Sequence, residues 1–142
     1  MEPDAVPEFW EWLAHLGQQG QLKIPLEIFE EIKDGPKDAG KDLLFDWIAQ
    51  PQVRAALLLD ESVNPDLVQR VVNQGYANDL TDAEVDELGR DPFLIAYGLA
   101  DIRQRTIVTS EVSRPGKRRQ NRKVPNVCND FGLSWCGPFD PV

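Results

Sequence analysis

The stretch "GRDPFLIAYGLADIRQRTIVTSE", residues 89–111, decides the fold because it joins a nearly all-apolar helix to a short apolar strand. Asp91 and Pro92 suit a helix start, since aspartate is a common N-cap and proline is favoured in the first turn. Apolar side chains from Phe93 to Ala100 cover every face of this helix, which predicts that it is packed on most sides. The segment "TIVTS" predicts a strand, and Glu111 follows its end.

Helices and short apolar segments alternate along the rest of the chain. We expect strands at 21–25 and 133–137 and helices at 7–20, 25–35, 41–50, 64–77, 81–89 and 124–132. The run 54–62 fits either a strand or a helix end. This alternation is typical of an α/β domain with a parallel sheet. A length of 142 residues predicts one domain over 1–142.

The composition excludes several classes of function. No apolar run approaches the ~20 residues of a membrane span, and the start has no secretory signal pattern. We therefore expect a cytoplasmic protein with no membrane partner. His15 is the only histidine, which excludes histidine triads, and Cys128 and Cys136 are interpreted as reduced core thiols. Catalysis would rest on carboxylates, which can hold a hard cation such as Mg²⁺ or Mn²⁺.

The charge is distributed unevenly. Residues 1–102 hold 7 Lys and Arg against 21 Asp and Glu, whereas residues 103–142 hold 8 against 3. Such a basic segment indicates contact with RNA phosphates; a solvated loop, or one docked on the acidic body, is the alternative. Base stacking is not expected, because no aromatic residue interrupts it. The candidate nucleic-acid-binding residues are Arg114, Lys117, Arg118, Arg119, Arg122 and Lys123.

Three acids are candidates for a catalytic site. Asp91 heads the apolar helix, and Glu111 follows a strand, at the edge where open α/β sheets bind ligands. Glu31 belongs to a helix with four acids between Glu27 and Asp34, whose mutual repulsion a divalent cation would relieve. The alternatives are a structural helix cap at Asp91 and a solvated acidic face around Glu31.

Four segments, taken in order, resemble a bacterial branch of the PIN-like domains: "IPLEIFEEIKDG", "DPFLIAYGLA", "TIVTSE" and "KRRQNRKVPNVCNDFGLSWCGPF". The resemblance runs from about Pro7 to Phe139. It implies a three-layer α/β/α sandwich with a small parallel sheet, and an Mg²⁺- or Mn²⁺-dependent endoribonuclease of toxin–antitoxin type. Glu31, Asp91 and Glu111 then match the catalytic and metal-binding acids, and RNA and a cognate antitoxin are the implied partners.

The chain departs from the PIN-like pattern at its start. Such domains usually open with an apolar strand that ends in a metal-binding aspartate, whereas this chain begins "MEPDAVPEFW". The resemblance thus implies an N-terminally shortened domain that lacks the family's central metal ligand, so that the chain is either an endoribonuclease or an inactive relative of one. The alternative function is a non-catalytic module that binds nucleic acid or protein through loop 114–123, and a third is a scaffold without chemistry. Unpaired sheet edges also predict a homo-oligomer.

Overall fold

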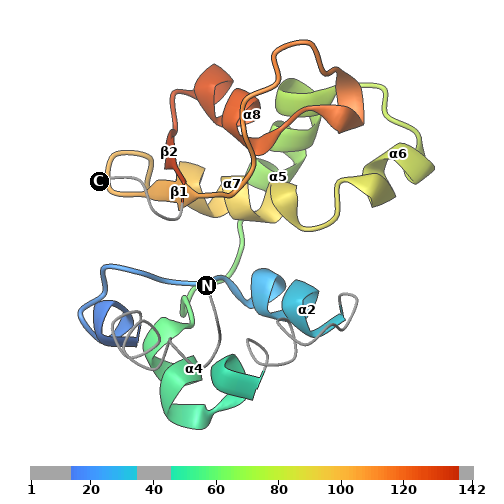
Figure 1. The fold of residues 1–142 in the computed structure, drawn as a ribbon. Helices are drawn as coiled ribbons and strands as arrows, with labels where there is room; N and C mark the ends of the chain where they lie inside the picture. Colours follow the sequence, from blue (N-terminus) through green and yellow to red (C-terminus); the bar gives the residue numbers. More distant parts are fainter. Residues whose placement is uncertain (1–13, 35–45, 138–142) are drawn as a thin grey trace. The chain divides into compact units, whose positions relative to one another are not determined.

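The computed structural model describes residues 14–34 and 46–137 (Figure 1). The chain divides into two compact units, residues 1–61 and 62–142, and each is described by itself. The predicted helical residues 7–13 and 41–45 lie outside the described residues. None of the helices in the described part of the chain is long and apolar enough to cross a membrane. Whether the two units act as the single predicted domain stays a prediction.

The first unit is a small helical cluster. Helix α2 (Leu26–Asp34) confirms the predicted helix after Pro25. The run 54–62 contains both predicted alternatives: its first residues end helix α4 (Pro51–Leu57), and Leu58 forms a bridge. The predicted strand 21–25 forms a single parallel bridge, between Ile24 and Leu58. Among the described residues of this unit, Phe29, Ile48, Val53 and Leu57 form a buried core cluster.

The second unit carries most of the predicted elements. Helices and strands follow one another in the order α5 (Pro65–Arg70), η2 (Val71–Tyr76), α6 (Asp82–Glu87), α7 (Asp91–Ala100), β1 (Thr106–Val108), η3 (Arg119–Asn121), α8 (Val124–Phe131) and β2 (Ser134–Cys136). The fold is therefore mostly helical, with a small α/β part.

Local signals in the sequence explain where the helices begin. The Asn64 side chain accepts a hydrogen bond from the Asp66 amide at 2.9 Å and starts α5. Thr81 and Glu84 form the predicted capping box at the start of α6, with reciprocal bonds of 3.0 and 3.2 Å. The predicted helix 64–77 widens into a π-helical segment, η2, that ends at Tyr76. Such widened turns are frequently found at functional sites.

Strands β1 and β2 form a parallel pair in which Ile107 lies opposite Trp135 (Figure 1). The Thr109 amide donates to the Cys136 carbonyl at 2.9 Å and extends the pairing beyond the strand ends. The parallel sheet of the sequence prediction is thus confirmed, with two strands in the described part of the chain. The two strands end at the same edge of the sheet, and the chain leaves β1 there toward Glu111.

Helix α7 is central to the second unit. It packs against α5, η2, α8 and β1, and Ile95 on it is 0% exposed, as its all-apolar sequence predicts. The buried core consists of Val71, Tyr76, Leu88, Ile95, Ala96, Ile107, Val124, Val127, Cys128 and Leu133. Strand β1, helix α8 and segment η2 are thereby held around one helix.

The contact between η2 and α8 can be tested at Gly75. A methyl group added there would lie 2.7 Å from Val127 Cγ1 and 3.0 Å from Phe131 Cε2. Overpacking a core costs about 1–3 kcal/mol, which exceeds the ~1 kcal/mol that alanine gains over glycine in a helix. We expect Gly75→Ala to lower the free energy of unfolding by about 1 kcal/mol in chemical denaturation.

Gly116 provides the control, because an added methyl group there meets no atom within 4 Å. Gly116→Ala should leave the midpoint of denaturation unchanged. An equal midpoint for Gly75→Ala and the native chain would contradict the tight packing of η2 on α8.

Candidate functional site

The second unit contains a charged cavity of about 220 Å³. Its lining brings together residues from several elements: the acids Glu87, Asp91 and Glu111, the bases Lys117, Arg122 and Lys123, and the neutral side chains Tyr76, Leu88, Gln120 and Asn121. Two of the three predicted acids and three of the six predicted basic residues therefore meet at one cavity. These lining residues come from the start of α7, from the chain after β1 and from the residues just before α8.

Asp91 reaches the cavity from the first turn of α7. The predicted N-cap is corrected here: Arg90 holds the N-cap position and Asp91 is the first helical residue. The reason is local: the backbone of Arg90 departs from helical geometry, whereas Asp91 is already helical and Pro92 follows it in the first turn. Asp91 is half-buried, and a negative charge in a first turn is favourable for the helix.

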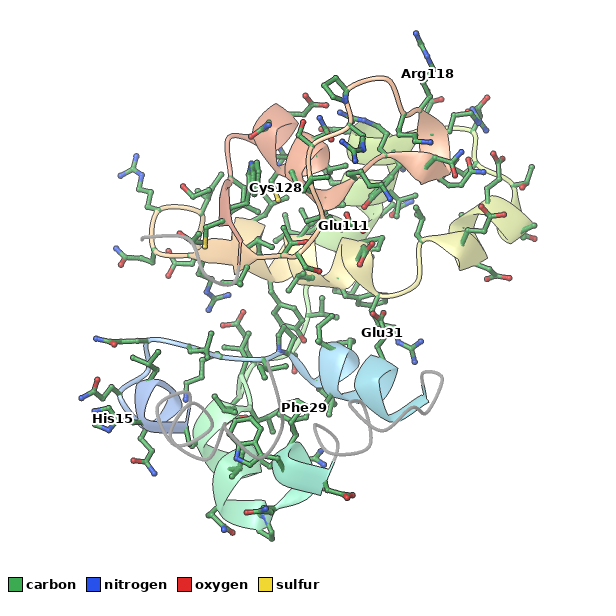
Figure 2. All side chains as sticks on the ribbon, in the orientation of Figure 1. His15, Phe29, Glu31, Glu111, Arg118 and Cys128 are labelled. Carbon is green, nitrogen blue, oxygen red and sulfur yellow. The ribbon has the colours of Figure 1, made fainter. Side chains whose placement is uncertain are left out.

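Glu111 reaches the cavity from the chain after β1. Its Oε2 accepts a hydrogen bond of 2.7 Å from the Val124 amide, at the first residue of α8. Val124 is 2% exposed, so this bond satisfies an amide that would otherwise be buried and unpaired. The Glu111 amide also donates to the Thr109 hydroxyl at 3.1 Å. Glu111, whose side chain is labelled in Figure 2, therefore has a structural role in addition to lining the cavity.

Glu31 lies on α2 of the first unit and is exposed. Because Glu31 belongs to the first unit and each unit is described by itself, the convergence of Glu31 with Asp91 and Glu111 stays a prediction. Among residues 14–34 and 46–137, no group of three or more His, Cys, Asp or Glu side chains is arranged to hold a metal ion. The cavity itself provides the carboxylates of Asp91 and Glu111, with Glu87 on its lining.

Arg119 fastens the basic loop to the body of the second unit. It donates to Asp79 Oδ1 at 2.7 Å and to both oxygens of Glu84, at 3.0 and 3.1 Å. Its backbone has a φ of 56°, a left-handed value that is uncommon for a residue with a side chain. These bonds to two acids hold the residue in that conformation.

The pKa of Glu84 reflects the same contact. The Arg119 guanidinium, together with the Thr81 amide, lowers the pKa of the Glu84 carboxyl to about 2. Because this value lies below the ordinary one, the contact contributes stability at neutral pH and loses that contribution as the pH falls toward 2. The ion pair between Arg119 and Glu84 is therefore intact throughout the physiological pH range.

Arg122 is likewise engaged within the fold. Its guanidinium donates to the Gly75 carbonyl, to the Asn126 carbonyl at 3.4 Å, and pairs with Asp130 at 2.8 Å. It therefore ties α8 to the end of η2. The contacts of Arg119 and Arg122 therefore agree with the alternative in which the basic loop docks on the acidic body.

The other basic residues of the loop are directed to solvent or to the cavity. Arg114, Lys117 and Arg118 are exposed and Lys123 is half-buried, and Arg118 extends away from the loop (Figure 2). A second, shallower hollow of about 570 Å³ adjoins the loop. Its lining, as far as the structure describes it, contains no acid and consists of Tyr76, Pro115, Lys117, Arg118, Arg119 and Arg122.

Tyr76 lines both hollows, and the sequence reasoning did not single it out. It sits at the end of a predicted helix, where its spacing resembles that of an ordinary core residue. Burial, and then the nearby carboxylates of Asp91 and Glu111, raise the pKa of its hydroxyl. The widened helical turn that presents Tyr76 has no sequence signal that we can identify.

Neither cysteine belongs to the lining of the cavity, and the single histidine belongs to the first unit. Cys128 is a free, buried thiol, and burial raises its pKa to about 12, which confirms its interpretation as a core thiol. Cys136 is also free and is half-buried on β2. His15 is exposed on the helical residues 14–18 of the first unit.

Comparison with known families yields one finding. The model of a family described as a domain of unknown function (DUF4411) matches residues 1–141. No curated protein and no solved structure matches the chain.

The hydrogen bond between Glu111 and Val124 predicts unequal effects for two substitutions of Glu111. Glu111→Ala leaves the buried Val124 amide without its partner, which costs about 1–3 kcal/mol of unfolding free energy. Glu111→Gln keeps an oxygen acceptor and should lose clearly less. Urea denaturation followed by circular dichroism measures both. Equal stability of the alanine variant and the native chain would refute the structural role.

Proposed function

The chain belongs to the DUF4411 family of domains, and we propose that it is a PIN-like, divalent-metal-dependent endoribonuclease. The observation that supports this proposal is the cavity of the second unit, where Asp91 and Glu111 meet Lys117, Arg122 and Lys123. This combination suits metal-dependent phosphodiester cleavage, because carboxylates hold the cation whereas lysine and arginine neutralise the phosphate.

The donor set fits Mg²⁺ or Mn²⁺ bound together with substrate. Mg²⁺ in proteins usually keeps several waters and is held by one or two carboxylates plus substrate phosphates. Asp91 and Glu111 supply two carboxylates, and Glu111 uses only Oε2 for the Val124 amide, which leaves Oε1 for a cation. A bound cation would supply Lewis-acid activation of a water and neutralise charge on the phosphate.

The side chains of the chain itself would orient the substrate. Lys117 and Lys123 carry positive charge on the cavity lining. Arg122 is held by its bonds to Gly75 and Asp130, so its position is fixed before RNA binds. Preorganised cations of this kind contribute to catalysis because they need not be rearranged during the reaction.

The PIN-like resemblance adds three further properties to the proposal. It assigns Glu31 as a third metal-binding carboxylate, a three-layer α/β/α sandwich as the complete fold, and a cognate antitoxin as a protein partner. Self-association belongs to the same proposal. None of these rests on the geometry of the cavity, and each needs its own measurement.

Cleavage of single-stranded RNA by the full chain tests the proposed activity. We expect cleavage that requires Mg²⁺ or Mn²⁺, and we expect Asp91→Asn and Glu111→Gln each to slow it by roughly a hundredfold or more, as when one preorganised electrostatic group is removed. Gel electrophoresis of labelled RNA measures the rate. Glu31→Gln, assayed alongside, tests the third carboxylate.

Asp101 is the matched control because it stands at the opposite end of α7 from Asp91 and is exposed. Asp101→Asn should cleave at the native rate. Cleavage that persists in Asp91→Asn, or that proceeds equally well in EDTA, would contradict the proposal.

A second candidate function is RNA binding without cleavage, and the basic hollow favours it. Lys117 and Arg118 line this hollow and are exposed. If they contact phosphates, binding should weaken as salt rises, with a slope of about 0.7 per contact for a single strand. Replacing both by alanine should make the slope shallower by about 1.4. Fluorescence anisotropy at several salt concentrations measures it.

The design of this salt experiment follows from the contacts of the loop. Arg119 is unsuitable for substitution because it is bonded to Asp79 and Glu84. Arg103 is exposed and lies outside both hollows, so Arg103→Ala is the matched control. An unchanged slope in the double variant would exclude the hollow as the binding surface. Steep salt dependence without any cleavage would support the second candidate over the first.

A further inference from the structure

The hydroxyl of Tyr76 is buried without a hydrogen-bond partner among the described residues. The residue is 7% exposed, and its side chain lines both the charged cavity and the basic hollow. A buried hydroxyl without a partner is unfavourable, and native proteins seldom contain one. Tyr76 is therefore the point in the second unit where a bound group would satisfy an existing polar atom.

None of the neighbouring described groups accepts a hydrogen bond from this hydroxyl. Glu111 gives Oε2 to the Val124 amide, and Arg122 has only donors, which it uses toward Gly75, Asn126 and Asp130. A tyrosine hydroxyl carries a proton at neutral pH and can donate it in a hydrogen bond. The missing partner is thus a hydrogen-bond acceptor.

The charge of the surroundings indicates which kind of acceptor fits. The hollow that Tyr76 shares with Lys117, Arg118, Arg119 and Arg122 is lined by cations. Phosphate oxygens are strong acceptors and carry negative charge, so both properties are met by one group. On the cavity side, the same phosphate would face the acid pair Asp91 and Glu111.

We propose that the Tyr76 hydroxyl donates a hydrogen bond to a phosphate oxygen of single-stranded RNA bound between the basic hollow and the charged cavity. The RNA ligand rests on the proposed function. Tyr76 is then a substrate-binding residue that fixes one phosphate next to the acid pair. This role is separate from cleavage, because it needs neither a metal ion nor turnover.

Tyr76→Phe removes only the hydroxyl and tests this assignment. The probe is a short fluorescein-labelled oligouridine, bound to the full chain in EDTA so that cleavage is prevented. We expect binding to weaken about tenfold, since hydrogen bonds to charged groups are among the stronger ones. We also expect the melting temperature to stay the same or rise, because the variant no longer buries an unpaired hydroxyl.

Tyr97→Phe is the matched control. Tyr97 is the other tyrosine, is 4% exposed, and lies outside both hollows. Its variant should bind RNA as the native chain does. An equal loss of binding in both variants would overturn the inference, because the loss would then reflect folding.

The remaining outcomes also separate the two proposals. Unchanged RNA binding by Tyr76→Phe, with a lower melting temperature, would overturn the inference and indicate a hydroxyl satisfied by internal water. Absence of RNA binding by the native chain would overturn it as well. Tyr76-dependent binding without cleavage in Mg²⁺ or Mn²⁺ would support the inference and contradict only the nuclease.

Discussion

The hydrogen bond from the Val124 amide to the Glu111 carboxylate is the contact on which the candidate site depends. It joins the chain that leaves β1 to the first residue of α8, across the loop that carries the basic residues. Because Val124 is buried, the amide cannot be satisfied by bulk water, and the carboxylate is held in place. The same bond therefore orders the helix start and directs an acid toward the cavity.

Contacts of two arginines in the same loop hold the neighbouring segments in place. Arg122, near the start of α8, reaches back to Gly75 and so fixes the end of η2 beside the cavity. Arg119 holds the middle of the loop against Asp79 and Glu84. The basic segment is consequently neither fully solvated nor fully docked: two arginines are used internally, whereas Lys117 and Arg118 are exposed. The loop therefore still displays positive charge on Lys117 and Arg118, although two of its arginines are bonded within the fold.

Features that depend on neighbouring residues could be predicted from the sequence. The all-apolar run after Asp91 predicted a packed α7, the Thr81–Glu84 spacing predicted a capping box, and the apolar segments around 106 and 134 predicted a parallel pair. The meeting of Asp91 and Glu111 at one cavity followed from the rule that ligands bind where parallel strands end. The sheet edge places such residues together whatever their role.

Features that depend on distant residues could not be predicted. The bonds of Arg119 cross 35 and 40 positions, and that of Arg122 to Gly75 crosses 47. No local pattern encodes such pairs, because any exposed acid is an equally good partner in the sequence. Tyr76 was missed for a related reason, since a helical tyrosine next to glycine resembles a core residue until its hydroxyl is found without a partner. The three-layer sandwich and the role of Glu31 rest on resemblance alone.

Whether Asp91 and Glu111 share a cation is decided most directly by adding substoichiometric Mn²⁺ to the isotopically labelled full chain and recording amide spectra. Paramagnetic broadening acts on nuclei close to the bound ion. We expect the amides of Asp91 and Glu111 to broaden before those of exposed acids such as Asp66 and Asp82, and Asp91→Asn to abolish that preference. Equal broadening at every acidic segment, unaltered by Asp91→Asn, would contradict a cation site in this cavity.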